Sequence, residues 1–439
     1  MTNTFNIITL GCKVNQYESE AVEELFLQKG YKKANENADI YVINTCTVTN
    51  MSDRKSRQMI SRARRDNPNA VVAVMGCYSQ VKPEEVAAIE GVDIVLGSRN
   101  KENVVELCED ILQNKEAIDK IIAPSESKTF EELQISNQTE MTRSYLKIQD
   151  GCNMYCSYCL IPYARGNIVS RDIPSIVGET KRLAKNNFKE IVLTGIHVSS
   201  YGKDFDDGSS LIDVIEAVAK VDGIERIRLS SMEPRHISIE FLERMKATKK
   251  ACDHFHLSLQ SGSDDILKAM NRKYDTVIYK QKVEEIRQVF PNAGITTDII
   301  VGFPGETEKN HKQTMEYAEE IKFSKMHLFK YSPREGTRAA KMSNQIDGRT
   351  KKNRLHDLEK IEEANRKEFL NKQIGKTLSV LIESKSDLEG YSGGHSTNYL
   401  KVNVKENIAA NTIIDVNITN IIDDELVGEI VEKGLLQKS

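Results

Sequence analysis

Short apolar segments alternate with helical sequence along most of this 439-residue chain. Within residues 1–115, helical sequence follows each of the segments FNIITL, DIYVINT, AVVAVMG and VDIVLG. Repetition of a strand and a helix is typical of a parallel sheet covered by helices. We therefore predict an α/β domain with a parallel sheet over residues 1–115. Residues 116–140 are polar and show no sustained periodicity, which predicts a linker.

The alternation starts again at residue 141 and continues to residue 374. Six strand candidates, most of them separated by helical sequence, are RSYLKIQ, KEIVLTG, IERIRLS, DHFHLSLQ, GITTDIIVGF and SKMHLFKY. Six parallel strands with intervening helices suit an open (β/α)6 barrel, a partial TIM barrel with its active site at the carboxyl ends of the strands. Residues 350–374 are highly charged, with apolar residues at helical spacing, and predict a surface or connecting helix.

Residues 375–439 show a third pattern. The segments KTLSVLIES, YLKVNV, TIIDVNITNI and LVGEIVE read as short strands without helices between them. This pattern predicts a small, OB-like all-β barrel. Three domains of ordinary size account for a chain of this length.

The composition argues against several classes of protein. Hydrophobic residues make up 39% of the chain, and no apolar run approaches the roughly 20 residues that span a bilayer. The N-terminal sequence MTNTFNIITLGCK does not have the pattern of a signal peptide. We therefore expect a cytoplasmic protein without membrane contact. The net charge of −4 does not indicate nucleic-acid binding by the whole surface, but it is compatible with a local basic face.

Three of the eight cysteines, Cys152, Cys156 and Cys159, directly follow the first strand of the predicted barrel. The spacing CxxxCxxC on a short loop lets each thiolate reach a different iron of a cubane cluster. No fourth cysteine is nearby, so one iron would stay open for another ligand. A bacterial ferredoxin motif or a structural zinc site would need a fourth ligand, and three cysteines without function seldom cluster in a cytosolic chain. The triad therefore indicates an iron-sulfur redox enzyme.

The segment GCNMYCSYCLIPYARG, with Ser170 and Arg171 after it, resembles the radical S-adenosylmethionine (SAM) superfamily, and specifically its methylthiotransferases. The resemblance implies that a 4Fe-4S cluster at this triad binds SAM at its open iron, and that an electron from a separate donor cleaves SAM to a 5′-deoxyadenosyl radical. A C–H bond on an aromatic base has no useful acidity. Breaking it therefore requires a radical that a cofactor carries.

A second set of cysteines, Cys12, Cys46 and Cys77, occupies the end of a predicted strand in each case. The carboxyl ends of parallel strands share one edge of a sheet, so these distant thiols can converge. Each one alone would be read as a small buried hydrophobe, which is how we interpret Cys108 and Cys252. The resemblance implies that the set binds a second 4Fe-4S cluster, the site of the sulfur to be transferred, and that SAM serves both as methyl donor and as radical source.

The carboxyl ends of the barrel strands carry residues that can approach SAM closely or form hydrogen bonds to it. By resemblance, the candidates are Gly195, His197, Ser231, Glu233, Ser258, Gln260, Asp298 and Gly302. The alternative for each is ordinary strand-end or turn chemistry. The Gly-Gly-Glu pattern that is common on the second strand of radical SAM enzymes reads Thr194-Gly195-Ile196-His197 here, which leaves open which group holds the SAM amino nitrogen.

The predicted helix after Cys46 has a basic face. Its cations Arg54, Lys55, Arg57, Arg62, Arg64 and Arg65 cover about half of the circumference, opposite Met59, Ile60 and Ala63. A solvated charged face is the alternative, but beside a cluster domain we predict contact with RNA phosphates through Arg54, Lys55, Arg62 and Arg65.

The C-terminal domain resembles the TRAM module, an RNA-binding domain. From Lys376 onward it holds six Lys and ten Asp or Glu residues. Because this balance is acidic, any contact with RNA must come from a local patch. The segment YSGGHSTNYLKVNVK carries residues that could stack on nucleotides or contact them, and among these we single out Tyr399 and Lys401.

Two further segments, NTCTVTNMSDRKSR and LTGIHVSSYG, resemble the MtaB group of the methylthiotransferases. The resemblance implies a tRNA methylthiotransferase, which adds a methylthio group to C2 of N6-threonylcarbamoyladenosine at position 37, next to the anticodon. We expect the protein to be a monomer. One alternative keeps the chemistry and changes the substrate to N6-isopentenyladenosine in tRNA. Another alternative is a non-catalytic iron-sulfur protein that binds RNA or senses redox state, although a fully ligated cluster would suit that role better.

Overall fold

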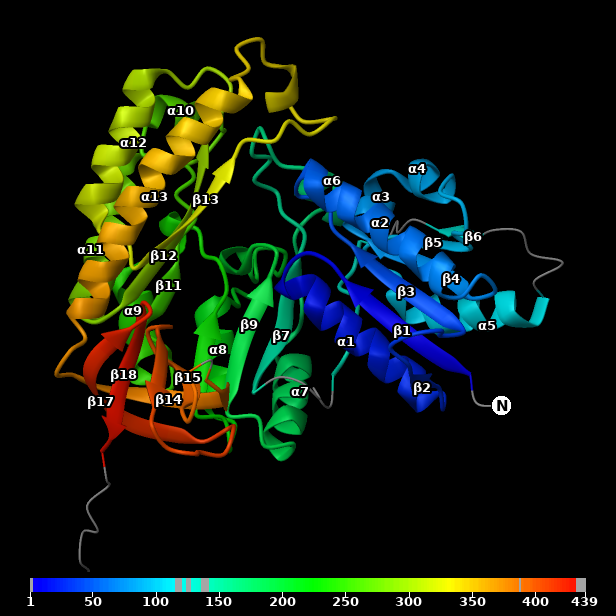
Figure 1. Ribbon diagram of the computed structural model, residues 1–439, viewed down its shortest axis with the longest axis horizontal. Coiled ribbons are helices and arrows are strands. Elements are labelled where there is room, and N and C mark those ends of the chain that lie inside the picture. The colour runs from blue at the N-terminus through cyan, green and yellow to red at the C-terminus, as the bar shows by residue number, and fades with distance from the viewer. Residues whose placement is uncertain (1–2, 115–120, 124–127, 136–141, 387, 432–439) are drawn as a thin grey trace, which may run out of the picture.

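The computed structural model describes residues 3–114, 121–123, 128–135, 142–386 and 388–431. Figure 1 shows three units in chain order: an α/β domain, a curved sheet with helices on its outer side, and a small β-barrel. The N-terminal domain lies beside the curved sheet, where helix α1 packs against strand β7. No helix in the described part of the chain is long and apolar enough to cross a membrane.

The N-terminal domain contains a six-stranded parallel sheet with the order β2-β1-β3-β4-β5-β6. Its strands are β1 Thr4–Thr9, β2 Lys32–Lys33, β3 Ile40–Thr45, β4 Val71–Gly76, β5 Ile94–Leu96 and β6 Ile121–Ala123. Its helices are α1 Lys13–Gln28, α2 Asn50–Asp66, α3 Cys77–Val81, α4 Pro83–Ala87, η1 Lys101–Asn103 and α5 Val104–Asn114. Strands β3 and β4 are buried along their whole length, as expected for central strands that helices cover on both faces.

The predicted linker over residues 116–140 lies partly outside the described residues, and its described part, residues 121–123 and 128–135, requires correction. Strand β6 lies within it and pairs with β5, because Ile121 lies opposite Ile94. Leu133 and Ile135 are buried against Tyr17 of α1. Such short apolar stretches show no periodicity, so their place in the first domain depends on contacts that are distant in sequence.

The central domain confirms the predicted open barrel of six parallel strands. Two sheets, with the orders β10-β9-β7-β8 and β11-β12-β13, are joined by isolated bridges between Ile227 and Ala251 and between Met232 and Leu257. The strands are β7 Arg143–Asp150, β8 Val169–Ser170, β9 Glu190–Gly195, β10 Arg226–Leu229, β11 His254–His256, β12 Gly294–Val301 and β13 Lys325–Lys330. Strand β8 is a short antiparallel addition to β7.

Helices cover the outer side of the barrel, and the largest hydrophobic core lies between them and the strands. The α-helices are α6 Ile161–Arg165, α7 Ile173–Lys185, α8 Leu211–Ala219, α9 Ile239–Ala247, α10 Asp264–Ala269, α11 Thr276–Val289, α12 Glu308–Ile321 and α13 Gly348–Asn371. The 3-10 helices are η2 Val198–Ser200, η3 Pro234–His236 and η4 Ala339–Lys341. Helix α13, predicted from its charge and spacing, packs against β13 and leads to the C-terminal domain (Figure 1).

The C-terminal domain is a closed barrel with the strand order β14-β15-β16-β18-β17, which confirms the predicted small β-barrel. The strands are β14 Thr377–Lys385, β15 Ser392–Ser396, β16 Lys401–Val404, β17 Ile413–Ile422 and β18 Glu425–Ile430. The sequence predicted four of the five strands. The fifth, β15, has the sequence SGGHS. Glycine is needed at Gly394 because a Cβ there would lie 2.0 Å from the carbonyl oxygen of Leu381.

Candidate active site between two cysteine triads

The first triad lies on the loop after β7, at the carboxyl end of the barrel. Gly151 starts this loop with φ = +72°, and a Cβ there would lie 1.9 Å from the carbonyl oxygen of Asn167, so only glycine fits. The backbone N–H of Cys152 donates to the carbonyl of Gly166 over 3.0 Å, and the N–H of Cys159 donates to the carbonyl of Cys156 over 3.0 Å. These bonds fold the loop so that its three thiols lie close together.

Burial, together with the neighbouring Cys156 and Cys152, raises the pKa of Cys159 to about 12. Burial likewise raises the pKa of Cys152. The guanidinium of Arg272 donates from Nη1 to the Cys156 sulfur over 3.2 Å and supplies a positive charge beside the triad. The free thiols of Cys152 and Cys159 are therefore protonated near neutral pH, and their binding to a metal as thiolates must release protons.

The second triad lies at the edge formed by three adjacent strands. Cys12 follows β1, Cys46 follows β3 and Cys77 follows β4, and these strands are neighbours in the sheet. Cys12 is exposed, whereas Cys46 and Cys77 are buried. Burial, together with the neighbouring Cys46 and Cys12, raises the pKa of Cys77 to about 11, although Arg165 opposes the rise. The structure therefore brings these distant thiols to one place, as expected from the parallel sheet.

Three thiols meet at each triad, and thiolates are ligands for iron-sulfur clusters as well as for zinc. Across the described residues, no three His, Cys, Asp or Glu side chains are arranged to hold one metal ion. A tetrahedral zinc site needs its ligands around one point, whereas ligands of a cubane cluster each bind a different iron. Each triad would supply three ligands and leave a fourth corner open.

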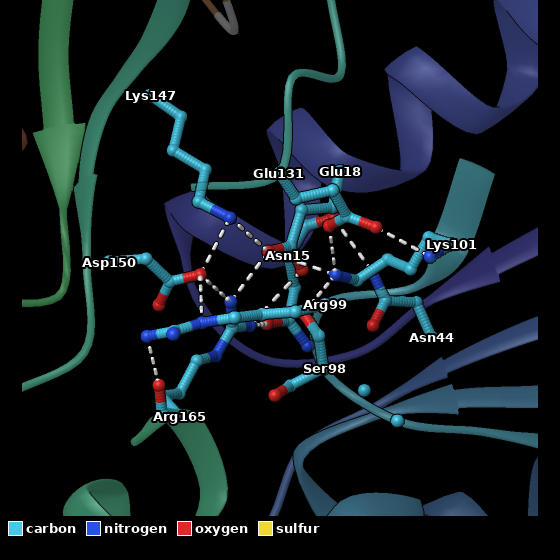
Figure 2. A network of polar contacts seen from close by, with 12 residues as sticks. Asn15, Glu18, Asn44, Ser98, Arg99, Lys101, Glu131, Lys147, Asp150 and Arg165 are labelled. Atoms are coloured by element: carbon cyan, nitrogen blue, oxygen red, sulfur yellow. Dashed lines mark hydrogen bonds and ion pairs between the residues drawn. The ribbon is translucent and has the colours of Figure 1, made fainter. Parts of the chain in front are cut away.

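A short segment connects the two triads. Helix α6 begins two residues after Cys159 and ends at Arg165, whose Nε donates to the Cys77 sulfur over 3.3 Å. Arg165 is fully buried among charged side chains from both domains, as Figure 2 shows. One short segment thus joins the first triad to a residue that contacts the second.

The SAM candidates lie along the carboxyl edge of four neighbouring strands. Gly195 ends β9 and His197 follows it, Ser231 and Glu233 follow β10, Ser258 and Gln260 follow β11, and Asp298 and Gly302 lie on or directly after β12. The Ser258 carbonyl accepts a hydrogen bond from Arg272, the residue that contacts Cys156. The set thus shares an edge with the first triad, while SAM binding itself stays a prediction.

Two of these candidates, His197 and Glu233, have pKa values below their usual range. Burial lowers the pKa of His197 to about 4, and the neighbouring His236 adds to the effect, so the imidazole is neutral. Burial opposes ionisation of Glu233, but hydrogen bonds from His236 and Arg235 bring its pKa down to about 2. The carboxylate of Glu233 is thus charged and already engaged with Arg235 over 2.7 Å.

The predicted RNA-binding residues separate into two groups. Arg54, Lys55, Arg62 and Arg65 are exposed on α2, and the opposite side of this helix is buried, as predicted. Arg64, which the sequence placed on the same face, instead donates to the Gly91 carbonyl over 2.6 Å and pairs with Asp93 over 2.9 Å.

Tyr399 and Lys401 do not offer a free surface. The Tyr399 ring stacks on His254 and His395, with centroids 4.7 and 5.0 Å away, and Arg228 and Arg143 lie against it. Lys401 pairs with Glu425 over 2.7 Å. The structure therefore places Tyr399 in the contact between the two barrels, and its predicted role in RNA stacking would require this contact to open.

Sequence reasoning missed several residues beside the triads. Arg165 and Arg272 donate to cysteine sulfurs, but isolated arginines carry no sequence signal of such a role. Two exposed tyrosines, Tyr155 within the first triad and Tyr163 on α6, lie with ring centroids 6.1 Å apart. Tyr155 also has φ = +48°, which is rare for a bulky residue and typical of functional sites.

Two family models match the chain. The Uncharacterized protein family UPF0004 matches residues 4–97, and the Radical SAM superfamily matches residues 146–318. These ranges contain the second and the first cysteine triad, respectively.

Curated relatives match nearly the whole chain. A threonylcarbamoyladenosine tRNA methylthiotransferase MtaB from Bacillus subtilis (strain 168) is 40% identical, over 90% of this chain and 88% of its own length. The MtaB of Aquifex aeolicus (strain VF5) is 41% identical, over 85% and 91%. A tRNA-2-methylthio-N(6)-dimethylallyladenosine synthase from Natranaerobius thermophilus is 36% identical, over 98% and 97%.

Among solved structures, the radical SAM methyltransferase TsrM from Kitasatospora setae covers 77% of this chain and 77% of its own, with a TM-score of 0.58 and 14% identity. This likeness supports the fold alone. The relatives at about 40% identity, with the two matching family models, establish the ancestry. The chain belongs to the radical SAM methylthiotransferase family, in its MtaB-type branch.

Proposed function

We propose that this enzyme adds a methylthio group to C2 of N6-threonylcarbamoyladenosine at position 37 of tRNA. The observation that carries the proposal is the meeting of two incomplete cysteine triads at one site, with Arg165 contacting the second triad from the segment that follows the first. Relatives that carry the name MtaB match along nearly the whole chain and support this choice of substrate.

In this proposal Cys152, Cys156 and Cys159 hold one 4Fe-4S cluster with SAM at its open iron, and the other triad holds a second cluster. When bound, these groups supply radical cleavage of SAM and the sulfur that is transferred. The protein itself excludes water from half of the ligands, since Cys46, Cys77 and Cys156 are buried. A dry site protects reactive species from side reactions.

The inner face of the barrel supports a polar substituent on the substrate. Phe255 and Met326 belong to the core between strands and helices, so their sequence neighbours His256 and His327 lie on the opposite, inner face. The Nδ1 atom of His256 lies 2.9 Å from Thr296 Oγ1, and the centroids of the His256 and His327 rings are 5.7 Å apart. Such a wall suits the hydroxyl and carboxylate of a threonylcarbamoyl group better than an apolar isopentenyl group.

Contact with tRNA would use the exposed cations of α2 and the tyrosines beside the first triad. Arg54, Lys55, Arg62 and Arg65 can neutralise phosphates. Tyr155 and Tyr163 present exposed rings, on which unpaired bases of an RNA loop commonly stack. The proposal places the enzyme in the cytoplasm, where tRNA is found, as a monomer that receives electrons from a separate donor.

The direct test uses anaerobically reconstituted protein, reductant, SAM and two tRNA substrates, one with threonylcarbamoyladenosine and one with isopentenyladenosine. Mass spectrometry of the digested tRNA should show a methylthio group on the threonylcarbamoyl nucleoside only. Modification of the isopentenyl nucleoside alone would overturn the substrate. Absence of 5′-deoxyadenosine from the reaction would instead favour a non-catalytic sensor.

A further inference from the structure

A buried network of charged side chains from both domains surrounds Arg165 (Figure 2). Glu18 of α1 accepts from Lys147 of β7 over 2.7 Å and lies 3.3 Å from Lys101 of the N-terminal domain. Lys147 also contacts Asp150 over 2.7 Å. The side chains of Glu18, Lys101, Lys147, Asp150 and Arg165 are each at most 1% exposed. Charges this deep are stable only when they are paired, so the network fixes how the two domains dock.

The guanidinium of Arg165 is held on every side. Its Nη1 donates to Glu18 over 2.5 Å and to Asp150 over 3.2 Å. Its Nη2 donates to Asn15 over 2.8 Å and to the second oxygen of Glu18 over 3.1 Å. These acceptors fix the plane of the guanidinium, so the remaining donor, Nε–H, points at the Cys77 sulfur, 3.3 Å away. A lysine could not reproduce this fork.

The same segment also touches the first triad. Gly166, next to Arg165, accepts the backbone hydrogen bond of Cys152, and the Asp150 carboxylate accepts from the N–H of Gly151 over 2.7 Å. Arg99 of the N-terminal domain donates to the carbonyl oxygens of Arg165 and Asn167. The loop that holds the first triad is thus anchored to the side chains that surround Cys77.

We propose that Arg165 is a positioning residue that raises the reduction potential of the cluster at Cys12, Cys46 and Cys77 and fixes this cluster relative to the first triad. The inference rests on the proposed function, which puts a cluster at these cysteines. A reduced cluster carries one more negative charge, and a buried cation that donates a hydrogen bond to a ligand sulfur stabilises that charge. Hydrogen bonds to cluster sulfurs are a known determinant of potential.

The test isolates the second cluster in the full chain by replacing Cys152, Cys156 and Cys159 with alanine. Arg165→Lys and Arg165→Gln are then added separately, and iron content and the midpoint potential are measured by electron paramagnetic resonance during redox titration. Both substitutions should leave the iron content unchanged and lower the potential. The reduction equilibrium should fall at least about tenfold, which is about 59 mV for one electron. The Gln variant should show the larger shift, because it also loses the charge.

A matched control is Arg171→Lys, another buried arginine, which pairs with Glu179 over 2.5 Å and also donates to Glu132 and Ser175. Its potential should match that of the parent. An unchanged potential in both Arg165 variants at full iron content overturns the inference and leaves the proposed function intact. Loss of iron from both variants also overturns it, because Arg165 would then hold the cluster without tuning it. If the parent protein binds no iron at Cys12, Cys46 and Cys77, the proposed function itself fails.

Discussion

Arg228 of β10 and Tyr399 of the C-terminal barrel lie face to face, with the guanidinium carbon 4.7 Å from the ring centroid. Arg228 also donates to the Thr397 carbonyl over 3.0 Å, and His254 stacks on the same ring. The amino ends of the barrel strands are therefore closed by a side chain from another domain. This contact makes the small barrel a structural part of the enzyme core.

Replacing Tyr399 with alanine should destabilise this contact. Loss of the cation-π and stacking contacts should lower the free energy of unfolding by about 2–4 kcal/mol. Tyr399→Phe keeps the ring and should stay within about 1 kcal/mol of the parent. Urea unfolding of the cluster-free protein measures both variants. Equal stability of the Ala and Phe variants would show that the stacked ring contributes nothing to the interface.

The carboxyl group of Glu190 should make the stability of the same region sensitive to acid. Burial alone would raise the pKa of its carboxyl, but Arg228, 2.7 Å away, together with Arg143 and Arg226, brings that pKa down to about 2. The folded-state pKa is thus below the unfolded value of about 4.5, so Glu190 contributes stability above pH 4.5 and loses it as the pH falls toward 2. The full contribution is about 3 kcal/mol.

Unfolding of cluster-free protein between pH 5 and pH 2.5 tests this expectation. Glu190→Gln should weaken the dependence of stability on pH in that window. Glu359→Gln, which changes an exposed carboxylate on α13, should leave the dependence as it is in the parent. Parallel curves for the Glu190 variant and the parent would contradict the assignment.

The six cysteines of the triads should control iron content separately from the two that pack. Reconstituted parent protein should hold about eight iron atoms, four for each cluster. Cys77→Ala should reduce this to about four and leave the cleavage of SAM to 5′-deoxyadenosine measurable. Cys108→Ala removes a fully buried thiol of the hydrophobic core and should keep all iron while losing about 1–2 kcal/mol of stability. Full iron content in the Cys77 variant would argue against the second cluster.

Much of the fold could be predicted from the sequence because periodicity is a local property. The six barrel strands and α13 all carry apolar residues at the spacing of their element. Strands β6 and β15 could not be predicted, because IIA and SGGHS carry little local signal and form strands only beside neighbours such as β5 and β14.

The candidate site likewise contains residues that the sequence revealed and residues that it did not. The cysteines were visible because thiols at strand ends are rare and chemically specific. Arg165 was not visible, because its role depends on Glu18 and Cys77, which lie 147 and 88 positions away in sequence. For Tyr399 the sequence suggested a role but did not reveal the surroundings of the ring. An aromatic ring in a predicted RNA-binding module suggests a nucleotide contact, but Arg228 and His254 already lie against this ring.

The basic face of α2 gives the clearest prediction for RNA binding. Arg54, Lys55, Arg62 and Arg65 are exposed, so replacing all four with alanine should leave the fold intact and weaken tRNA binding. Each lost phosphate contact should also reduce the salt dependence of binding by about 0.7–0.9 in the log-log slope. A matched control on the same helix is Arg64→Ala. Because Arg64 contacts the Gly91 carbonyl and Asp93, this change should reduce stability and leave the salt slope unchanged.

Fluorescence anisotropy with labelled tRNA at several salt concentrations measures the slope. A slope that the fourfold variant does not change would exclude α2 from the RNA interface and leave the tyrosines beside the first triad as the contact to test.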